Sequence, residues 1–357
     1  MNDKEMLDIY TDYLISSFGL TTGTGLSKLM NGSISHDQIQ RFLARPSQIS
    51  VDLWWMVKPY LRQIEALDGV LIVDDSIAEK PYTDENDIIC WHYDHSKDRN
   101  VKGINFITAL YHAQETSLPV GLELVAKTET YHDAKTDKMK CRSPLSKNER
   151  YQILIRQAKA NQIQFRYVLN DVWFASADNM MFIKHEIERD FIMPLKSNRK
   201  LALSLADKRA GLYLRLDSLE LTAEKPQTIY LEGVDFPLLL VKQVFTNEDG
   251  SLGILYWVTS DVELSYELIT TIYKKRWNVE PYHQSLKQNA RLEKSPTRTI
   301  QTQSNHLLAS VCAFIKLEWL KRDTASNHFA LKSKLYLQAL RVAFASLQEL
   351  KPIRFSA

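Results

Sequence analysis

Cysteine is scarce in this sequence, and long hydrophobic runs are missing. The three cysteines among 357 residues, Cys90, Cys141 and Cys312, lie far apart without metal-ligand spacing, which indicates a reducing, cytoplasmic environment. No stretch reaches the roughly eighteen apolar residues typical of a membrane helix. The N-terminus opens with acidic residues and lacks the basic start and apolar run of a signal peptide. We therefore expect a cytoplasmic protein with no membrane partner.

Several common catalytic motifs are also absent. There is no glycine-rich phosphate loop, no Gly-x-Ser-x-Gly nucleophile motif, no zinc pattern and no internal repeat. The hydrophobic fraction of 45% and the charged fraction of 25% are those of an ordinary globular protein. A chain of this length is expected to form two or three units.

The net charge of +2 conceals a local asymmetry. Between Val262 and Arg322, ten lysines and arginines stand against five acids, a net charge of +5. Such a basic segment attracts phosphates through counterion release. This segment is therefore a candidate nucleic-acid surface.

Residues 1–67 have the pattern of a helical region. The stretch GLSKLMNGSISHDQIQRFLARP contains a short amphipathic segment, a break at Gly32, and a second helix with Ser35 as its N-cap. The pattern resembles a helix-turn-helix, although two ordinary packed helices remain the alternative. In the first interpretation, the residues available to DNA are Gln38, Gln40 and Arg41.

Two apolar runs end in aspartates. GVLIVDDS predicts a buried strand that ends at Asp74 and Asp75, and FRYVLND predicts another that ends at Asp171. Further strands are expected at VKGINFITALYHAQ, LPVGLELVAK and DFIMPLKSN, the last with Lys196 at its exit. The spacing of these elements indicates an α/β fold.

Other segments complete the expected organisation. The lysine-rich stretch KTETYHDAKTDKMKCRSPLSKNE predicts a surface loop, and NERYQILIRQAKANQI predicts an amphipathic helix. From about Arg199 to Asp261 the chain is β-rich, with strands at LYLRL, QTIYLEG, FPLLLVKQVF and LGILYWVTS.

The run ITTIYKKRWNVEPYHQSLKQ contains the most informative residues. Three residues follow Tyr273 at offsets of three, seven and fourteen. On one continuous helix, these offsets would put the four side chains within about 60° of one another. That face would carry a carboxylate, two cations and a phenol, although a solvated face with charge pairs is the simpler alternative. The four residues are Tyr273, Arg276, Glu280 and Lys287.

Together, Asp74, Asp171 and Glu280 form a candidate carboxylate triad. Hard divalent cations such as Mg²⁺ prefer oxygen ligands, and two of them about 4 Å apart support in-line attack on a phosphodiester. The ribonuclease H-like pattern Asp-x-Ser/Thr favours Asp74 as the first ligand, with Asp75 as the alternative. For Asp171 the competing interpretation is a helix N-cap.

The spacing Y-x2-R-x3-E-x6-K is the signature of the insertion-sequence-four family of bacterial DDE transposases, which this sequence resembles. Tyr273, Arg276, Glu280 and Lys287 match it at every position, and Trp277 extends the match. IVDDS, VLNDVWF and the β-rich insertion also resemble that family. The resemblance covers roughly residues 69–322.

By that resemblance, Asp74, Asp171 and Glu280 would be catalytic and would bind the metal, Mg²⁺ or Mn²⁺. DNA-binding roles would fall to Tyr273, Arg276, Lys287, Lys196 and Trp277. In family relatives the insertion can supply a tryptophan that stacks on a flipped base, but the strand context of Trp257 favours a place in the core. Pro281 departs from an ideal helix and is expected to kink it, which would shift Lys287 relative to Arg276.

The predicted architecture is a ribonuclease H-like mixed-sheet core with a β-rich insertion and an N-terminal helical domain. The predicted segments are a DNA-binding domain 1–68, a core 69–198 and 262–322, an insertion 199–261, and a helical tail 323–357.

The predicted function is cut-and-paste transposition: cleavage at the ends of the element, then joining of the 3′-hydroxyls to target DNA. We expect double-stranded DNA as partner, a homodimer in the DNA complex, and association with the nucleoid. The alternatives are a DNA-binding relative that has lost its chemistry and a stand-alone nuclease.

Overall fold

The computed structural model describes residues 1–46, 49–94, 97–134, 136–247 and 249–350. The chain forms two compact units. The first contains Met1–Val57, Ala78–Gly103 and Pro281–Ala357; the second contains Lys58–Ile77 and Ile104–Glu280. The predicted mixed α/β class with N-terminal helices is confirmed. Residues 351–357 of the predicted tail lie outside the described residues.

Five neighbouring strands form the centre of the second unit, in the order β4-β3-β1-β7-β8. β7 runs parallel to both β1 and β8, whereas β3 and β4 are antiparallel. The four apolar residues that open β1 are fully buried, as expected for a strand covered on both faces. The bounds are β1 (Val70–Glu79), β3 (Arg99–Ala113), β4 (Thr116–Leu124), β7 (Tyr167–Asn170) and β8 (Asp190–Pro194).

The β-rich stretch continues this same sheet beyond β8. Its strands pair antiparallel in the order β8-β13-β12-β11-β9-β10. A short helix, α7 (Leu205–Arg209), and a 3-10 turn, Leu216–Ser218, interrupt it. The bounds are β9 (Lys200–Ala202), β10 (Leu214–Arg215), β11 (Gln227–Leu231), β12 (Leu238–Thr246) and β13 (Leu252–Thr259).

The predicted amphipathic helix is confirmed as α5 (Lys147–Ala160). Ser146 caps its N-terminus in a capping box with Glu149, which satisfies two backbone donors. α5 packs closely on β4, because a Cβ added at Gly121 would lie 2.7 Å from Leu154 Cδ2. α6 (Ala177–Met181) and a π-helix, Phe182–Ile187, follow β7.

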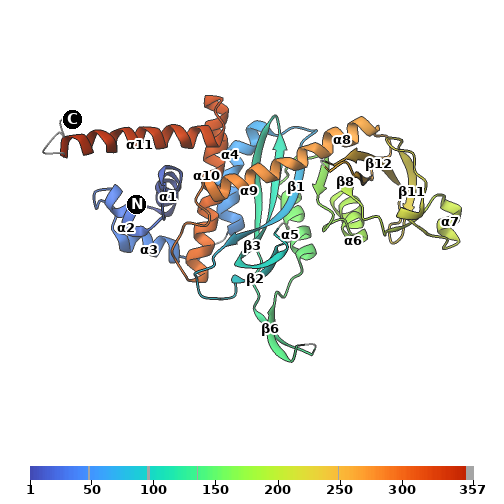
Figure 1. The fold of residues 1–357 in the computed structure, drawn as a ribbon, viewed down its shortest axis with the longest axis horizontal. Coiled ribbons are helices and arrows are strands. Elements are labelled where there is room, and N and C mark those ends of the chain that lie inside the picture. The colour runs from blue at the N-terminus through green and yellow to red at the C-terminus, as the bar shows by residue number, and fades with distance from the viewer. Residues whose placement is uncertain (47–48, 95–96, 135, 248, 351–357) are drawn as a thin grey trace. The chain divides into compact units, whose positions relative to one another are not determined.

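The lysine-rich stretch was expected to be a loop, and this prediction is wrong. It forms an antiparallel hairpin of β5 (Glu129–Asp133) and β6 (Lys138–Arg142) (Figure 1). Opposite charges pair across it, as Arg142 does with Glu129 at 3.1 Å. Nearly all of its side chains are exposed, so no alternation of apolar and polar residues marks it as strand.

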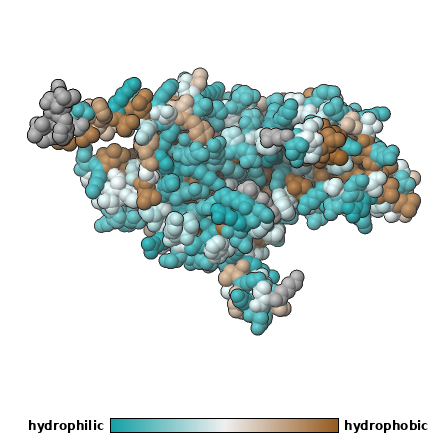
Figure 2. Space-filling view, viewed as in Figure 1, coloured by the Kyte–Doolittle hydropathy of each residue, from teal (hydrophilic) through white to brown (hydrophobic). Residues whose placement is uncertain are grey.

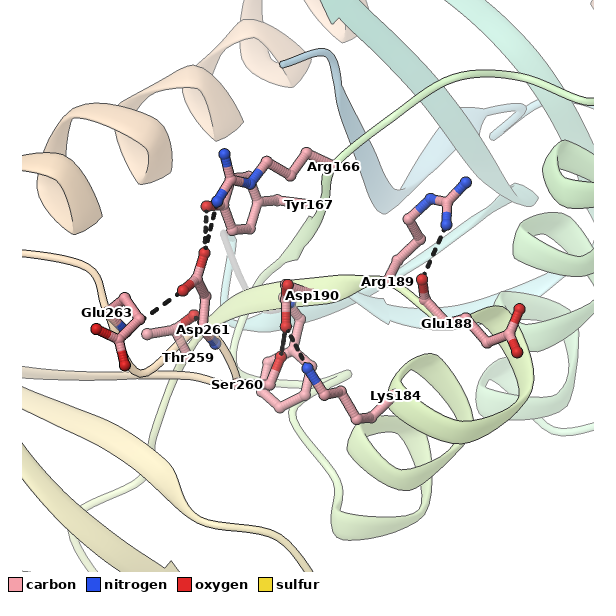
Figure 3. A network of polar contacts seen from close by, with 11 residues as sticks. Arg166, Tyr167, Lys184, Glu188, Arg189, Asp190, Thr259, Ser260, Asp261 and Glu263 are labelled. Atoms are coloured by element: carbon pink, nitrogen blue, oxygen red, sulfur yellow. Dashed lines mark hydrogen bonds and ion pairs between the residues drawn. The ribbon is translucent and has the colours of Figure 1, made fainter. Parts of the chain in front are cut away.

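A polar network stabilises the first residues of β7 and β8 and the end of β13 (Figure 3). Asp261 accepts hydrogen bonds from the Tyr167 hydroxyl at 2.7 Å and from Arg166 Nη2 at 3.0 Å. Asp190 accepts from Ser260 Oγ and Lys184 Nζ, both at 2.7 Å. Each of these two acids therefore has a cationic partner.

Helices dominate the first unit. α1 and α3 pack against α10, where Tyr10 bonds to His306 Nδ1 at 3.0 Å and Asn305 donates to the Leu43 carbonyl at 2.7 Å. Ser35 caps α3, as predicted. The bounds are α1 (Asp3–Ser16), α2 (Gly23–Leu29), α3 (His36–Ala44), β2 (Ile89–Asp94), α10 (Ile300–Thr324) and α11 (His328–Leu350).

α4 (Ile49–Ile64) begins in the first unit and ends in the second. Across the described ranges, none of the helices combines the length and apolar character required to span a bilayer.

Candidate active site

The pairing of β1 with β7 brings two of the predicted acids to one edge of the sheet. Val73 lies opposite Asn170 in this parallel pair. Asp74 is the next residue within β1, and Asp171 directly follows the last residue of β7, so the two acids lie side by side where β7 ends. β1 itself continues to Glu79, so the predicted strand end at Asp74 and Asp75 is wrong. Two apolar strand sequences thus deliver two carboxylates to one place.

The two carboxylates are in a poorly compensated environment. Burial and the neighbouring carboxylates of Asp171 and Asp75 raise the pKa of Asp74 to about 8. Burial also raises the pKa of Asp171, although backbone N–H groups of Trp173 and Phe174 lower it in part. Acids that raise one another's pKa in this way are typical of functional sites.

Asp75 has different surroundings. Its Oδ2 accepts a hydrogen bond from Lys147 Nζ at 2.7 Å and another from Asn105 Nδ2 at 3.0 Å. Successive residues of a strand point to opposite faces, which separates it from Asp74. Asp75 is thus held by a cation and an amide, whereas Asp74 lies with Asp171 and Arg276.

The continuous helix expected around Glu280 is interrupted, and this prediction is wrong. α8 (Tyr266–Lys274) ends before a 3-10 turn, Lys275–Asn278, and α9 (Val279–Gln288) begins directly after it. Pro281 therefore lies in the first turn of α9, where its missing N–H has no helical partner to lose. The break was expected at Pro281, after Glu280, but the structure places it before α9, between Tyr273 and Glu280.

Arg276, in the 3-10 turn, lies between two acids. Its Nη1 is 3.8 Å from Asp74 Oδ2 and 3.8 Å from Glu280 Oε1. Its buried Nε has no hydrogen-bond partner in the described part of the chain. This Nε is buried, so the contacts of the guanidinium with the two acids are made through its Nη1.

Tyr273 is tied to the end of β7. Its hydroxyl donates to the Asn170 carbonyl at 3.2 Å, and its ring lies 5.7 Å from that of Trp257. Burial raises its pKa far above neutrality. Tyr273 thus joins α8 to the strand that precedes Asp171. Trp257 is 5% exposed, which agrees with its expected place in the core.

Comparison with known families supplies independent evidence. The model described as DDE superfamily endonuclease matches residues 2–211, more than half of the chain. The chain belongs to the DDE superfamily of endonucleases. A second model, described as transposase DDE domain, matches residues 145–315. A search of curated proteins found no match.

The two matched ranges together contain the three acids of this DDE endonuclease. Asp74 lies in the first range, Glu280 in the second, and Asp171 in both. Their assignment as the metal-binding triad remains a prediction.

The other predicted residues have separate positions. Lys196 follows β8, and its Nζ lies 4.5 Å from the centre of the Trp173 ring. Trp277 is exposed, with the Arg276 guanidinium 4.8 Å from its ring centre. Lys287 belongs to the first unit, where its Nζ lies 4.0 Å from Glu293 Oε1. A DNA-binding role for these residues stays a prediction.

The donor chemistry of this DDE endonuclease suits a hard divalent cation. Asp74, Asp171 and Glu280 offer only oxygen ligands, and the raised pKa of both aspartates shows that their negative charge is undercompensated. No three histidine, cysteine or acidic residues within the described ranges are already grouped closely enough to hold an ion. The residues thus fit such an ion in type and charge.

Sequence reasoning missed two residues beside these acids. Lys147 contacts Asp75 from 72 positions away, and nothing local in the sequence signals that contact. Trp173 had a signal, because a tryptophan follows the predicted strand-end Asp171 by two positions. Its N–H donates to Asp171 Oδ1 at 3.0 Å.

Proposed function

We propose that this DDE endonuclease is a transposase that cleaves DNA at the ends of its own element and joins the freed 3′-hydroxyls to target DNA. The observation that carries this proposal is the placement of Asp74, within β1, beside Asp171, directly after β7, with Arg276 Nη1 3.8 Å from both Asp74 and Glu280. The match to a transposase DDE domain supports it.

We also propose a ribonuclease H-like core and membership of the insertion-sequence-four family. The strand order β4-β3-β1-β7-β8, with parallel β1, β7 and β8, supports the first. The Y-R-E-K spacing supports the second.

In the proposed mechanism, Asp74, Asp171 and Glu280 hold Mg²⁺ or Mn²⁺. The chemistry supplied by such a bound ion is Lewis-acid activation of a phosphodiester. Arg276 orients the backbone phosphate through its guanidinium. The DNA-binding role proposed for Lys287 rests on the sequence spacing alone. Tyr273 holds the end of β7 in place, which keeps Asp171 beside Asp74.

We propose double-stranded DNA as the substrate and a dimer in the DNA complex, because two ends must be paired for joining. Every residue from Ser333 to Leu350 is exposed, and α11 shows hydrophobic surface in Figure 2. Leu337, Leu340, Phe344 and Leu347 recur at the heptad spacing of a helix-pairing seam. A second copy of α11 is the occupant we propose for this stripe.

The helix-turn-helix role of α2 and α3 has weaker support. Residues 1–68 contain six lysines and arginines against eight acids. A net charge of −2 is unfavourable for phosphate binding. Gln38 also uses its side chain in the capping box of α3.

The test is cleavage and strand joining on the element's own end sequences with Mg²⁺, comparing wild type with Glu280→Gln. Glu263→Gln, an exposed glutamate of the same unit, is the matched control. We expect wild type and the control to cut and join, and Glu280→Gln to bind without cutting. Cutting without joining would indicate a stand-alone nuclease. Binding without cutting by wild type under any divalent metal would indicate a silent relative.

A further inference from the structure

The first turn of α5 is bonded to the strand that carries Asp74. Lys147, the first residue of the helix, donates through Nζ to Asp75 Oδ2 at 2.7 Å. Asp75 directly follows Asp74 in β1. Asn105 Nδ2, on β3, donates to the same oxygen at 3.0 Å, so three elements meet at the Asp75 carboxylate. The bond to α5 is therefore one residue away from a predicted metal ligand.

A second residue of α5 is bonded beside the other strand-borne acid. The Tyr151 hydroxyl donates at 2.8 Å to Oδ1 of Asn170, the last residue of β7, and both residues are fully buried. The Tyr151 ring also stacks on Phe174, with ring centres 4.9 Å apart and planes 15° apart. Since Asp171 lies between Asn170 and Phe174 in the chain, Tyr151 contacts residues on both sides of that acid.

Both bonds join one side of α5 to one face of the sheet. The two residues on α5 are four positions apart, which places them one above the other on the helix. Val73 lies opposite Asn170 in the β1–β7 pair, so their side chains share a face of the sheet. Asp75 lies two residues after Val73 and points to that face as well. Asp74 therefore points to the opposite face, away from α5.

We propose that Lys147 and Tyr151 are positioning residues, which together set how the Asp74 and Asp171 carboxylates are placed for a divalent cation. This inference rests on the proposed function. α5 is bonded to a chain neighbour of each acid, so a shift of one strand relative to the other would break one of the two bonds. Two adjacent carboxylates repel one another, and residues that orient ligands in this way support metal binding.

Lys159 is a matched control for Lys147 on the same helix. Its side chain is 44% exposed, against 47% for Lys147, and its Nζ lies 3.4 Å from Glu188 Oε2. Half-exposed ion pairs contribute little to stability, so Lys147→Met and Lys159→Met should both fold. Glu188 is not a predicted metal ligand. An effect that Lys159→Met does not share therefore belongs to the bond with Asp75.

Tyr111 is the corresponding control for Tyr151. Both are fully buried tyrosines of the second unit, and the Tyr111 hydroxyl accepts a hydrogen bond from the Ala66 N–H at 2.9 Å. Replacement of either by phenylalanine removes one buried hydroxyl and keeps the ring. The two variants should therefore lose similar amounts of stability, whereas only Tyr151→Phe should disturb the acids.

The first measurement is Mn²⁺ binding to the whole protein without DNA, followed by electron paramagnetic resonance of the free ion. We expect Lys147→Met and Tyr151→Phe to weaken Mn²⁺ binding about 10- to 100-fold, as loss of a residue that orients a ligand does. Lys147→Arg should restore most of the affinity, because arginine keeps the positive charge and the N–H donors. Lys159→Met and Tyr111→Phe should bind as wild type does.

Cleavage of the element's own end sequence with Mg²⁺ is the second measurement. In Lys147→Met and Tyr151→Phe, kcat should fall about 10- to 100-fold while KM for DNA stays near that of wild type. In a protein that already carries Asp75→Asn, adding Lys147→Met should cause little further loss, because the two changes remove the same bond. Fully additive losses would show that Lys147 does not act through Asp75.

The outcomes separate this inference from the proposed function. If Lys147→Met and Tyr151→Phe bind Mn²⁺ as tightly as wild type, the inference is overturned, and cleavage by wild type would leave the transposase proposal standing. If both bind more weakly than their controls while wild type cuts no DNA, the inference stands and the transposase proposal fails. A loss in Lys159→Met equal to that in Lys147→Met, or no Mn²⁺ binding by wild type, would also overturn the inference.

Discussion

The two ends of strand β7 place acidic residues in opposite environments. At its start, Asp261 is bonded to Tyr167 and Arg166 (Figure 3). Burial alone would raise its pKa, but these hydrogen bonds outweigh burial and lower it. Beyond its end, burial and neighbouring acids raise the pKa of Asp74 to about 8.

The difference separates an acid with stabilising partners from an acid that we propose takes part in the chemistry. Asp261 contributes to the fold through partners that favour its ionised form. Asp74 and Asp171 have too little positive charge nearby, so their ionisation opposes folding unless a cation arrives. An aspartate at the start of β7 thus has stabilising partners, whereas the aspartates near its end lack them, as the proposed metal-binding role requires.

The largest expected effect comes from the acids at the end of β7 and β1. Asp171→Asn or Asp74→Asn should reduce DNA cleavage by about a thousandfold, since each removes a metal ligand. Neither should lower the thermal midpoint, because each removes charge repulsion. Cleavage assays and thermal unfolding check this; a large loss of stability in Asp171→Asn would break the comparison.

The substitution Asp261→Asn, at the start of β7, should change the stability of the fold and leave cleavage unchanged. Asp261→Asn weakens charge-assisted hydrogen bonds to Tyr167 and Arg166, and should lower the free energy of unfolding by about 1–2 kcal/mol. Cleavage by the folded protein should be unchanged. Urea unfolding with parallel cleavage assays tests this, and lost activity without lost stability would contradict it.

His306 extends the comparison to a buried group that must stay neutral. Burial lowers its pKa to about 3, while its ring bonds to Tyr10 and to the Arg291 carbonyl at 3.0 Å each. Its ordinary pKa is about 6.5, so below that pH the unfolded chain binds a proton that the folded chain does not. Its contribution to stability should fall by about 1.4 kcal/mol per pH unit from pH 6.5 towards 3.

Urea unfolding at pH 7, 6 and 5 measures this slope against His306→Gln. The variant is expected to be less stable at pH 7 but to lose less stability on acidification. If the free energy of unfolding depended on pH equally in the two proteins, groups other than His306 would determine that dependence.

An effect smaller than that of Asp74→Asn separates Asp75 from Asp74. Asp75 is held by Lys147 and Asn105. Asp75→Asn should therefore reduce cleavage by about 10- to 100-fold, as loss of a supporting residue does, rather than a thousandfold. If Asp75→Asn were as inactive as Asp74→Asn in the same assay, Asp75 would be the ligand.

Local sequence was enough to predict much of this fold. Buried strands appear as apolar runs, and Asp171 could be identified because a change in polarity marks the end of β7. The same change at Asp74 does not end β1, which continues to Glu79. Ser35 as a cap and α5 as an amphipathic helix were predicted correctly for similar local reasons. The hairpin β5–β6 was missed because neither of its faces is buried. Its sequence therefore lacks the alternation of apolar and polar residues that indicates a strand.

The sequence by itself determined that the apolar runs are buried strands, that Asp171 follows one of them, and that a proline follows Glu280. Only the tertiary structure decided which acid has partners, since Lys147 and Asn105 reach Asp75 from 72 and 30 positions away. It also decided that Trp173 is exposed while Trp257 is buried, and that Arg276 lies between Asp74 and Glu280. Burial and charge pairing depend on residues distant in the chain, whereas strand ends and helix caps depend on neighbours.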